Sequence, residues 1–334
     1  MAILEILESM QMAAGKNRLV IVLDGMGTVI VKKLLPADGF FNRHMVESTR
    51  AIFPPTTVAA TTAYRTGKLP CQTEFIGWAQ YFAETDEVVE MFRNTNYYTG
   101  DVSKLPQHSG TMPCPRVVAA MNDSGRRAVE IMPAFEENGC ATFEEWLDKI
   151  VDTCNRETDA YIYAYWTEPD HSLHYNGTTD AGVRATLREM EEKTESALGR
   201  IKNHTDILIT ADHGHRDQEN LFLEEDFPDV AECLLHPLSV EPRCAALFIR
   251  PEKMAEFPEL FNRHFGAHFK LVPKAEFERE YLHCDHPIRF VGDFMAVATG
   301  DYSLCQNRNV KHFKSNHAGA TDDELQIPII KLSV

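Results

Sequence analysis

Short runs of apolar residues alternate along the chain with longer segments in which apolar residues recur every three or four positions. Three runs share one form: residues 18–24 (RLVIVLD), 160–166 (AYIYAYW) and 206–210 (DILIT). Such uninterrupted runs are typical of strands that are buried on both faces, as in parallel sheets. A fourth run, residues 244–249 (CAALFI), ends before Pro251 and predicts another strand.

Two longer segments have the spacing of amphipathic helices. In residues 142–154 the apolar side chains form one stripe, and Thr142 with Glu145 has the spacing of a capping box at its start. Residues 180–202 predict a second, longer helix. Since predicted strands alternate with predicted helices, we expect an α/β fold with a mainly parallel sheet.

Two regions have a less regular pattern. Residues 79–135 contain NTNYYTG, KLPQHSG and MPCPR, which predict an insertion that acts as a lid. Residues 236–292 contain scattered prolines and a short helical pattern near residues 254–264, which predict a smaller subdomain. Residues 17–334 are expected to form a single catalytic domain that contains both regions.

Composition narrows the class of protein. The 334 residues are 44% apolar and 25% charged, which fits a soluble globular protein with a sizeable core. The net charge of −17 argues against a nucleic acid duplex or an anionic membrane as a partner, since both need clustered Lys and Arg. A small phosphorylated substrate stays compatible with this charge if bound cations reverse the local field.

The cysteines and the N-terminal residues indicate in which cellular compartment the protein is expected. The eight cysteines are scattered and none forms C-x-x-C, so a disulfide framework is not expected. Glu5 and Glu8 stand where a signal peptide would carry positive charge. No apolar run approaches the ~18 residues of a membrane span. These features predict a reduced, cytoplasmic protein.

The candidate chemistry lies where the apolar runs end. Carboxyl ends of parallel strands are where sites form in open α/β sheets. The three runs lead to acids and histidines that suit zinc, and a further histidine follows much later in SNHAGATDDELQIPII: Asp24, Asp170, His174, Asp212, His213 and His317. Two such ions side by side would bridge the attacking and leaving oxygens of a phosphoryl group.

A nucleophile for this chemistry is expected in residues 53–67 (FPPTTVAATTAYRTG). The two prolines fix a turn, and VAATTAY then begins a helix whose free N–H groups suit a phosphate. Thr57 is the preferred nucleophile, and it would need activation by metal coordination. Thr56 stays a competing candidate.

FPPTTVAATT, TEPDHSLH, TADHGH and NHAGATDDELQIP occur in the order of the alkaline phosphatase superfamily, and most resemble its type I phosphodiesterase and nucleotide pyrophosphatase branch. The resemblance runs from about residue 19 to residue 330. It implies an alkaline-phosphatase-like three-layer sandwich with a mainly parallel central sheet and an inserted lid or subdomain. It also implies two divalent ions, zinc or alternatively manganese.

The resemblance assigns roles residue by residue. One ion would be held by Asp24, Asp212 and His213, with Thr57 approaching it. The other ion would be held by Asp170, His174 and His317. Thr57 would attack phosphorus and form a phosphothreonine intermediate, which water would then hydrolyse. Glu168 and His171 are not expected to be ligands.

The sequence departs from the family pattern at two places. No Asn follows Thr57 closely to help hold the phosphate, and Thr73-Glu74 replaces the usual His-Gly after the T-G-x-x-P turn. The first departure weakens a nucleotide assignment more than it weakens phosphoester chemistry. Contacts to the phosphate are instead expected from backbone N–H groups or from the side chains of Thr61, Thr62 and His215.

Other functions stay open at this point. A phosphodiesterase or nucleotide pyrophosphatase is favoured, with a phosphomonoesterase, phosphomutase or phosphonate hydrolase on the same metal core as alternatives. A non-catalytic binding protein would be expected to lack some of the seven positions. A dinucleotide-dependent oxidoreductase is disfavoured because Ile30 replaces the third glycine of G-x-G-x-x-G.

Several clusters have simpler interpretations. The segment His283-Cys284-Asp285-His286 is expected to be a loop without a metal. Four glutamates of the second helix are expected to form a solvated face: Glu189, Glu191, Glu192 and Glu195. The acids at 322–324 are expected to open a helix. Trp78, Tyr97 and Tyr98 could stack on a substrate ring, but packing is favoured.

Overall fold

The structure is a computed structural model that describes residue 6, residues 15–106 and residues 114–334. The N-terminal segment with Glu5 and Glu8 lies outside the described residues, as do residues 107–113 of the predicted lid. Among the helices that the structure describes, none has the length and apolar character needed to span a membrane.

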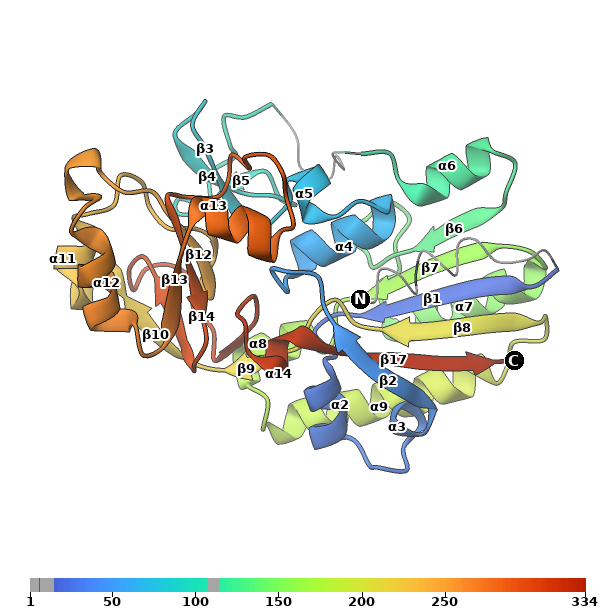
Figure 1. Cartoon of the computed structure of the whole chain (residues 1–334). Coiled ribbons are helices and arrows are strands. Elements are labelled where there is room, and N and C mark those ends of the chain that lie inside the picture. Colours follow the sequence, from blue (N-terminus) through green and yellow to red (C-terminus); the bar gives the residue numbers. More distant parts are fainter. Residues whose placement is uncertain (1–5, 7–14, 107–113) are drawn as a thin grey trace.

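A six-stranded central sheet forms one half of the molecule (Figure 1). Strands β6, β7, β1 and β8 are parallel neighbours, and β17 lies antiparallel between β8 and β2. This arrangement confirms the predicted α/β fold with a mainly parallel sheet. The strand bounds are β1 Asn17–Leu23, β2 Met45–Arg50, β6 Ala128–Ile131, β7 Tyr161–Trp166, β8 Thr205–Thr210 and β17 Gln326–Ser333.

Helices cover both faces of this sheet and make it the middle of three layers. Figure 1 shows α4 (Thr57–Thr66) and α6 (Val117–Asp123) on one side, and α2 (Thr28–Leu34), α3 (Phe40–His44) and α9 (Ala181–Leu198) on the other. Helix α7 (Phe143–Arg156) packs against α9. Its Thr142 cap accepts a hydrogen bond from the N–H of Glu145, so the predicted capping box is present.

One glutamate of α9 is not on the solvated face that the sequence predicted. Glu191 is only 6% exposed, and its Oε1 accepts a hydrogen bond from the N–H of Phe41 at 2.8 Å. The carboxylate satisfies the N-terminal end of α3, where backbone N–H groups have no partner within the helix. A run of glutamates therefore does not by itself define an exposed face.

A seven-stranded antiparallel sheet forms the other half of the molecule. Its order is β13-β14-β12-β11-β3-β4-β5, so residues 79–96 pair with strands from residues 239–298. The fourth apolar run forms β12 in this sheet, and not a strand of the parallel sheet. The strand bounds are β3 Ala79–Phe82, β4 Glu87–Glu90, β5 Thr95–Asn96, β11 Ser239–Glu241, β12 Cys244–Leu247, β13 Phe269–Pro273 and β14 Phe294–Ala298.

The predicted extents of the lid and the subdomain stay predictions. Helix α12 (Phe257–Phe265) covers the second sheet with three buried phenylalanines. Shorter elements complete the chain: α5 Pro70–Thr73, α8 Asp170–Asn176, α10 Leu223–Asp226, α11 Pro228–Ala231, α13 Lys274–Glu276, α14 Asp322–Leu325, β9 Arg216–Asp217, β10 Glu219–Phe222, β15 Tyr302–Cys305, β16 Ser315–Asn316, a 3₁₀ turn Pro251–Lys253 and a π-helical turn Phe277–Tyr281.

One cysteine pair departs from the fully reduced state expected from the sequence. Cys71 and Cys284 form a disulfide with their Cα atoms 5.4 Å apart. The bond joins α5 to the loop after the π-helical turn, across 213 positions of sequence. The spacing of the cysteines along the chain could not reveal this pairing. The cytoplasmic location stays a prediction.

Candidate active site

The three strands that lead to acids and histidines are neighbours in the central sheet. Strand β1 lies between β7 and β8, so Asp24, Asp170 and Asp212 meet at one edge. Gly25, at φ +70°, allows this close approach, since a Cβ there would lie 2.9 Å from Cα of Asp170. The backbone N–H of Asp170 also donates to the carbonyl of Asp24 at 3.0 Å.

Thr57 faces this edge from the first turn of α4. Its Oγ1 lies 3.1 Å from Nε2 of His213. Thr56 is the N-cap residue, and its hydroxyl turns away to donate to Oε1 of Glu241 at 2.5 Å. The two adjacent threonines therefore have different surroundings, and Thr57 is the one that lies beside the acids and histidines.

A first group of possible metal ligands consists of Asp24, Asp170 and His213. Nε2 of His213 lies 3.3 Å from Oδ1 of Asp24 and 3.7 Å from Oδ2 of Asp212. These two carboxylate oxygens are buried, and neither has a hydrogen-bond partner within the described parts of the chain. Buried, unpaired carboxylate oxygens are costly unless a cation or donor meets them, so the residues fit a divalent ion.

A second group consists of Asp170, His174, His215 and His317. Oδ1 of Asp170 lies 3.3 Å from Nε2 of His174 and 3.8 Å from Nε2 of His317. Nε2 of His215 lies nearer, at 2.6 Å from the same oxygen. His215 was expected from the sequence only as a contact of the phosphate. Because a carboxylate accepts hydrogen bonds, His215 donates to Asp170 and fixes its orientation.

The ring orientations of three histidines suit metal ligation. Nδ1 donates to a backbone carbonyl in each case: His174 to Ser315 at 2.9 Å, His213 to Gly214 at 3.1 Å and His317 to Pro55 at 3.1 Å. A proton on Nδ1 leaves the lone pair on Nε2, which faces the acids. The backbone thus selects the tautomer that a metal would need.

The pKa values of the three acids are shifted in different directions by burial and by neighbouring charges. Burial, reinforced by the neighbouring carboxylates, raises the pKa of Asp24 and of Asp212 well above the usual range. Burial has the same tendency at Asp170, but His174 and His215 outweigh it and hold the pKa of Asp170 well below its usual range. Burial also lowers the pKa of His215 to about 4. The buried imidazole of His215 is therefore neutral beside crowded acids, as expected of a cation site.

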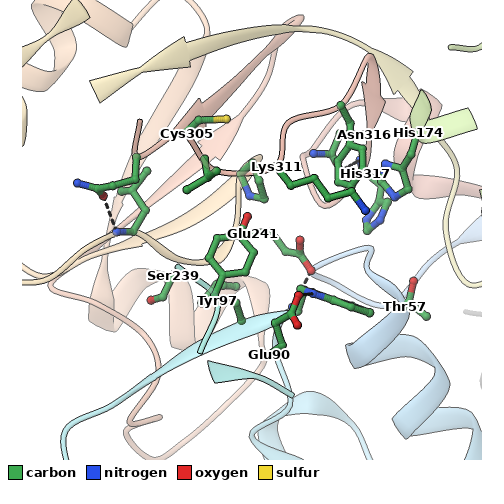
Figure 2. Close-up of a pocket in the computed structure, with 18 of the residues that line it drawn as sticks. Thr57, Glu90, Tyr97, His174, Ser239, Glu241, Cys305, Lys311, Asn316 and His317 are labelled. Carbon is green, nitrogen blue, oxygen red and sulfur yellow. Dashed lines mark hydrogen bonds between the residues drawn. The ribbon is translucent and has the colours of Figure 1, made fainter. Parts of the chain in front are cut away.

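A cavity of about 240 Å³ opens from Thr57 and the second group. Figure 2 shows Thr57, His174 and His317 at one side of it and Glu90, Tyr97 and Ser239 at the other. Residues of the second sheet line it together with residues of α4, α8 and the segment that carries His317, so the second sheet supplies part of the wall that faces the metal groups. Other residues that line the cavity include Trp78, Arg93, Tyr98, Glu241, Lys311 and Asn316.

Trp78, one of the aromatic residues that line the cavity, is held by two hydrogen bonds. Its backbone N–H donates to Glu241 at 2.8 Å, and its indole N–H donates to Glu90 at 2.9 Å. The guanidinium of Arg93 lies 5.5 Å from the ring centroid. Packing was favoured for Trp78, Tyr97 and Tyr98, but all three line the cavity. They are therefore placed to contact a substrate.

Several polar residues that the sequence raised lie outside the two metal groups. Glu168 accepts the N–H of Ser172 at the start of α8, and His171 is exposed at the cavity rim. Thr61 donates to the carbonyl of Thr57, and neither it nor Thr62 lines the cavity. Cys284 is held in the disulfide, so its segment lacks a free thiolate.

Comparison with known families agrees with this site. The family model of the type I phosphodiesterases / nucleotide pyrophosphatases matches residues 18–321. The chain belongs to this family. It is therefore a hydrolase of the class that cleaves phosphodiester or pyrophosphate bonds. No curated protein matches the chain by sequence.

Solved structures of this family share the fold of the chain. Murine ectonucleotide pyrophosphatase / phosphodiesterase 5 superposes with a TM-score of 0.70 at 17% identity, covering 93% of this chain and 87% of its own. The human protein of the same name gives 0.71 at 15% identity, covering 94% and 87%. An inactive murine form, with a threonine replaced by alanine, was solved in complex with AMP and gives 0.70 at 17% identity, covering 94% and 87%.

Proposed function

We propose that this family member hydrolyses a small phosphodiester or phosphoanhydride of the nucleotide type, with Thr57 as nucleophile and two divalent ions, zinc in preference to manganese. The observation that carries the proposal is the placement of Thr57. Its hydroxyl lies at the start of α4, lines the cavity and lies 3.1 Å from Nε2 of His213. Thr56, the competing nucleophile, donates its hydroxyl to Glu241 instead.

The metal ligands would be those that the family resemblance assigned. Asp24, Asp212 and His213 would hold one ion beside Thr57, and Asp170, His174 and His317 would hold the other. When bound, the ions would stabilise negative charge on the phosphoryl oxygens and favour the ionised hydroxyl of Thr57. Zinc suits this set of carboxylates and imidazoles.

The protein's own groups would position the phosphate. The first N–H groups of α4 lack partners within the helix and lie at the end of the helix that carries Thr57. The side chain of Lys311 reaches towards His174 and His317 (Figure 2), where it would face a phosphate oxygen. Attack by Oγ1 of Thr57 on the phosphorus of a diester would break the bond to one organic group and give a phosphothreonine that still carries the other group. Water would then cleave the bond between phosphorus and Oγ1, which releases a phosphomonoester and restores the hydroxyl.

We propose a diester in preference to a monoester. Tyr97 lies opposite the metal groups and Trp78 also lines the cavity, so an organic group on the phosphate would contact them. A phosphomonoester has only one such group, and inorganic phosphate has none. The murine relative solved with AMP is consistent with a nucleotide-type group in such a cavity.

A paired assay tests this function. Metal-stripped protein is reloaded with zinc or manganese and given a nitrophenyl phosphate diester and the matching monoester. We expect metal-dependent turnover with a diester preference, loss of turnover in Thr57→Ala and retention in Thr56→Ala. A monoester preference would point to a phosphatase or mutase. Normal turnover by Thr57→Ala would exclude this residue as the nucleophile.

A further inference from the structure

Glu241 is a buried carboxylate in the wall of the cavity that neither metal group includes. It ends β11 and is 6% exposed. Its Oε1 accepts hydrogen bonds from the hydroxyl of Thr56 at 2.5 Å and from the N–H of Trp78 at 2.8 Å. Its Oε2 accepts none from any residue that the structure describes. Figure 2 shows Glu241 between Tyr97 and Thr57.

The second carboxylate oxygen of Glu241, Oε2, has no hydrogen-bond donor among the described residues and is free to bind a ligand. A carboxylate taken out of water is stable only when hydrogen bonds or a cation replace its solvation. No Lys, Arg or His of the described residues forms an ion pair with Glu241, and burial raises the pKa of its carboxyl to about 7. Glu241 lines the cavity, so a ligand that enters can take the place of water at this oxygen.

The backbone beside Glu241 is held in an unusual conformation. Val240 has φ +75°, which is unfavourable for a β-branched residue. Gly77 packs on it so closely that a Cβ would lie 2.6 Å from Cγ1 of Val240. Strain of this kind persists where the surrounding structure enforces it, and it concentrates at ligand sites. Here it fixes the strand end that carries Glu241.

Glu90, the other glutamate that lines the cavity, differs from Glu241 because both of its carboxylate oxygens accept hydrogen bonds. Its Oε1 accepts from the indole N–H of Trp78 at 2.9 Å, and its Oε2 accepts from the hydroxyl of Thr95 at 2.6 Å. Both oxygens of Glu90 are therefore satisfied within the protein. Of these two glutamates, Glu241 alone offers an acceptor to a ligand.

We propose that Glu241 recognises a hydroxyl group on the organic part of the phosphoester substrate, so that the enzyme selects polyol or sugar esters. This inference rests on the proposed function, because it places the organic group opposite Thr57. A hydroxyl is favoured over an ammonium group because Lys311, for which the described residues provide no ion pair, lines the same cavity and would repel a cation, whereas Arg93 is paired with Glu90. A hydroxyl donor also suits a carboxyl that lacks a cationic partner.

The test compares two esters that differ only in their hydroxyls. Glyceryl p-nitrophenyl phosphate carries two hydroxyls, and propyl p-nitrophenyl phosphate has the same chain without them. Binding is measured by calorimetry on zinc-loaded Thr57→Ala protein, which removes the proposed nucleophile and makes the measurement independent of turnover. Kinetics with intact Thr57 are measured in parallel.

Glu241→Gln is the informative variant. The amide oxygen can still accept from Thr56 and Trp78, which turns the NH₂ group towards the cavity and replaces an acceptor by a donor. We expect a glyceryl preference of about tenfold to a hundredfold in Kd, the effect of a hydrogen bond to a charged group, and a fall to about tenfold or less in Glu241→Gln, where the hydroxyl can only accept a neutral hydrogen bond from the amide. Glu90→Gln is the matched control and is expected to keep the preference.

Two results would overturn the proposal. One is equal binding of both esters by the Thr57→Ala protein. The other is an equal loss for both esters in Glu241→Gln, which would limit Glu241 to positioning Thr56 and Trp78. Failure of the proposed function would be seen separately, as an absence of nitrophenolate release from either ester while the binding preference persists.

Discussion

Arg243 and Glu324 form a fully buried ion pair between the second sheet and the segment that carries His317. Nε and Nη2 of Arg243 lie 2.6 and 2.8 Å from the two oxygens of Glu324, and both side chains are 0% exposed. Glu324 also accepts hydrogen bonds from the N–H of Gly319 and the hydroxyl of Thr321. The pair thus fixes the turn that follows His317.

Replacing Glu324 by Gln is expected to destabilise the protein by about 3–5 kcal/mol, because Arg243 would be left as an unpaired buried charge. The free energy of unfolding in urea measures this effect. Asp323→Asn is the matched control, since Asp323 pairs with Arg216 at 2.6 Å but is 33% exposed. We expect the control to cost less than about 1 kcal/mol. Equal costs for the two variants would contradict this account.

The same pair predicts a dependence of stability on pH. Burial alone would raise the pKa of Glu324, but Arg243 and the neutral donors lower it below its usual value of 4.5. A lowered pKa in the folded state means that the stabilisation is complete above the unfolded-state pKa. It is lost as the pH falls through the folded-state pKa. Unfolding midpoints below pH 4.5 should therefore fall less steeply in Glu324→Gln than in the wild type.

His317→Ala is expected to reduce the bound metal from about two ions to about one per chain, because three ligands would hold each ion. Elemental analysis after dialysis measures the content. His171→Ala serves as the control, since His171 lies on the rim of the cavity but in neither metal group. Unchanged metal in His317→Ala, with normal thermal unfolding, would remove His317 from the ligand set.

Gly77→Ala is expected to destabilise the protein by about 1–3 kcal/mol, the usual cost of overpacking. The added Cβ would lie 2.6 Å from Cγ1 and 2.8 Å from the carbonyl oxygen of Val240. Thermal unfolding measures the effect. Gly199→Ala is the control, because its Cβ would meet only atoms at 3.6 Å and its φ is −65°. An unchanged unfolding temperature in Gly77→Ala would show that β11 can shift to accommodate the added methyl group.

The disulfide predicts a thiol count. Protein purified without reductant and then denatured should show six reactive thiols, and reduction should raise the number to eight. Cys71→Ser should show seven, since Cys284 would be released. Eight thiols before reduction would agree with the reduced state expected from the sequence, and would show that Cys71 and Cys284 are adjacent but unbonded in solution.

The parts of the site that follow apolar strands could be predicted from the sequence. Asp24, Asp170 and Asp212 each come directly after a buried run or within four residues of one, so the topology of a parallel sheet brings them together. The role of Thr57 also rested on a local pattern, the start of a helix after two prolines. Such patterns involve residues close together in the sequence, so they can be recognised without knowledge of the tertiary structure.

Glu241 could not be predicted in this way. Its importance depends on Thr56 and Trp78, which are 185 and 163 positions away, and the segment SVEPR carries no local signal. The prediction that Glu191 lies on an exposed face was wrong for the same reason, because its hydrogen-bond partner lies on α3. The strand at residues 244–247 was predicted, but its sheet was not, since an apolar run does not specify the strand it pairs with.

Strand β17 has a consequence for how the protein is made. It occupies the interior of the central sheet, between β2 and β8, although it is formed by residues 326–333. On the ribosome, β2 and β8 are synthesised long before the strand that joins them. Until then both expose unpaired backbone groups that other nascent chains could bind. Completion of the sheet is therefore a late event, and a chain interrupted before residue 326 would have a gap in the middle of its sheet.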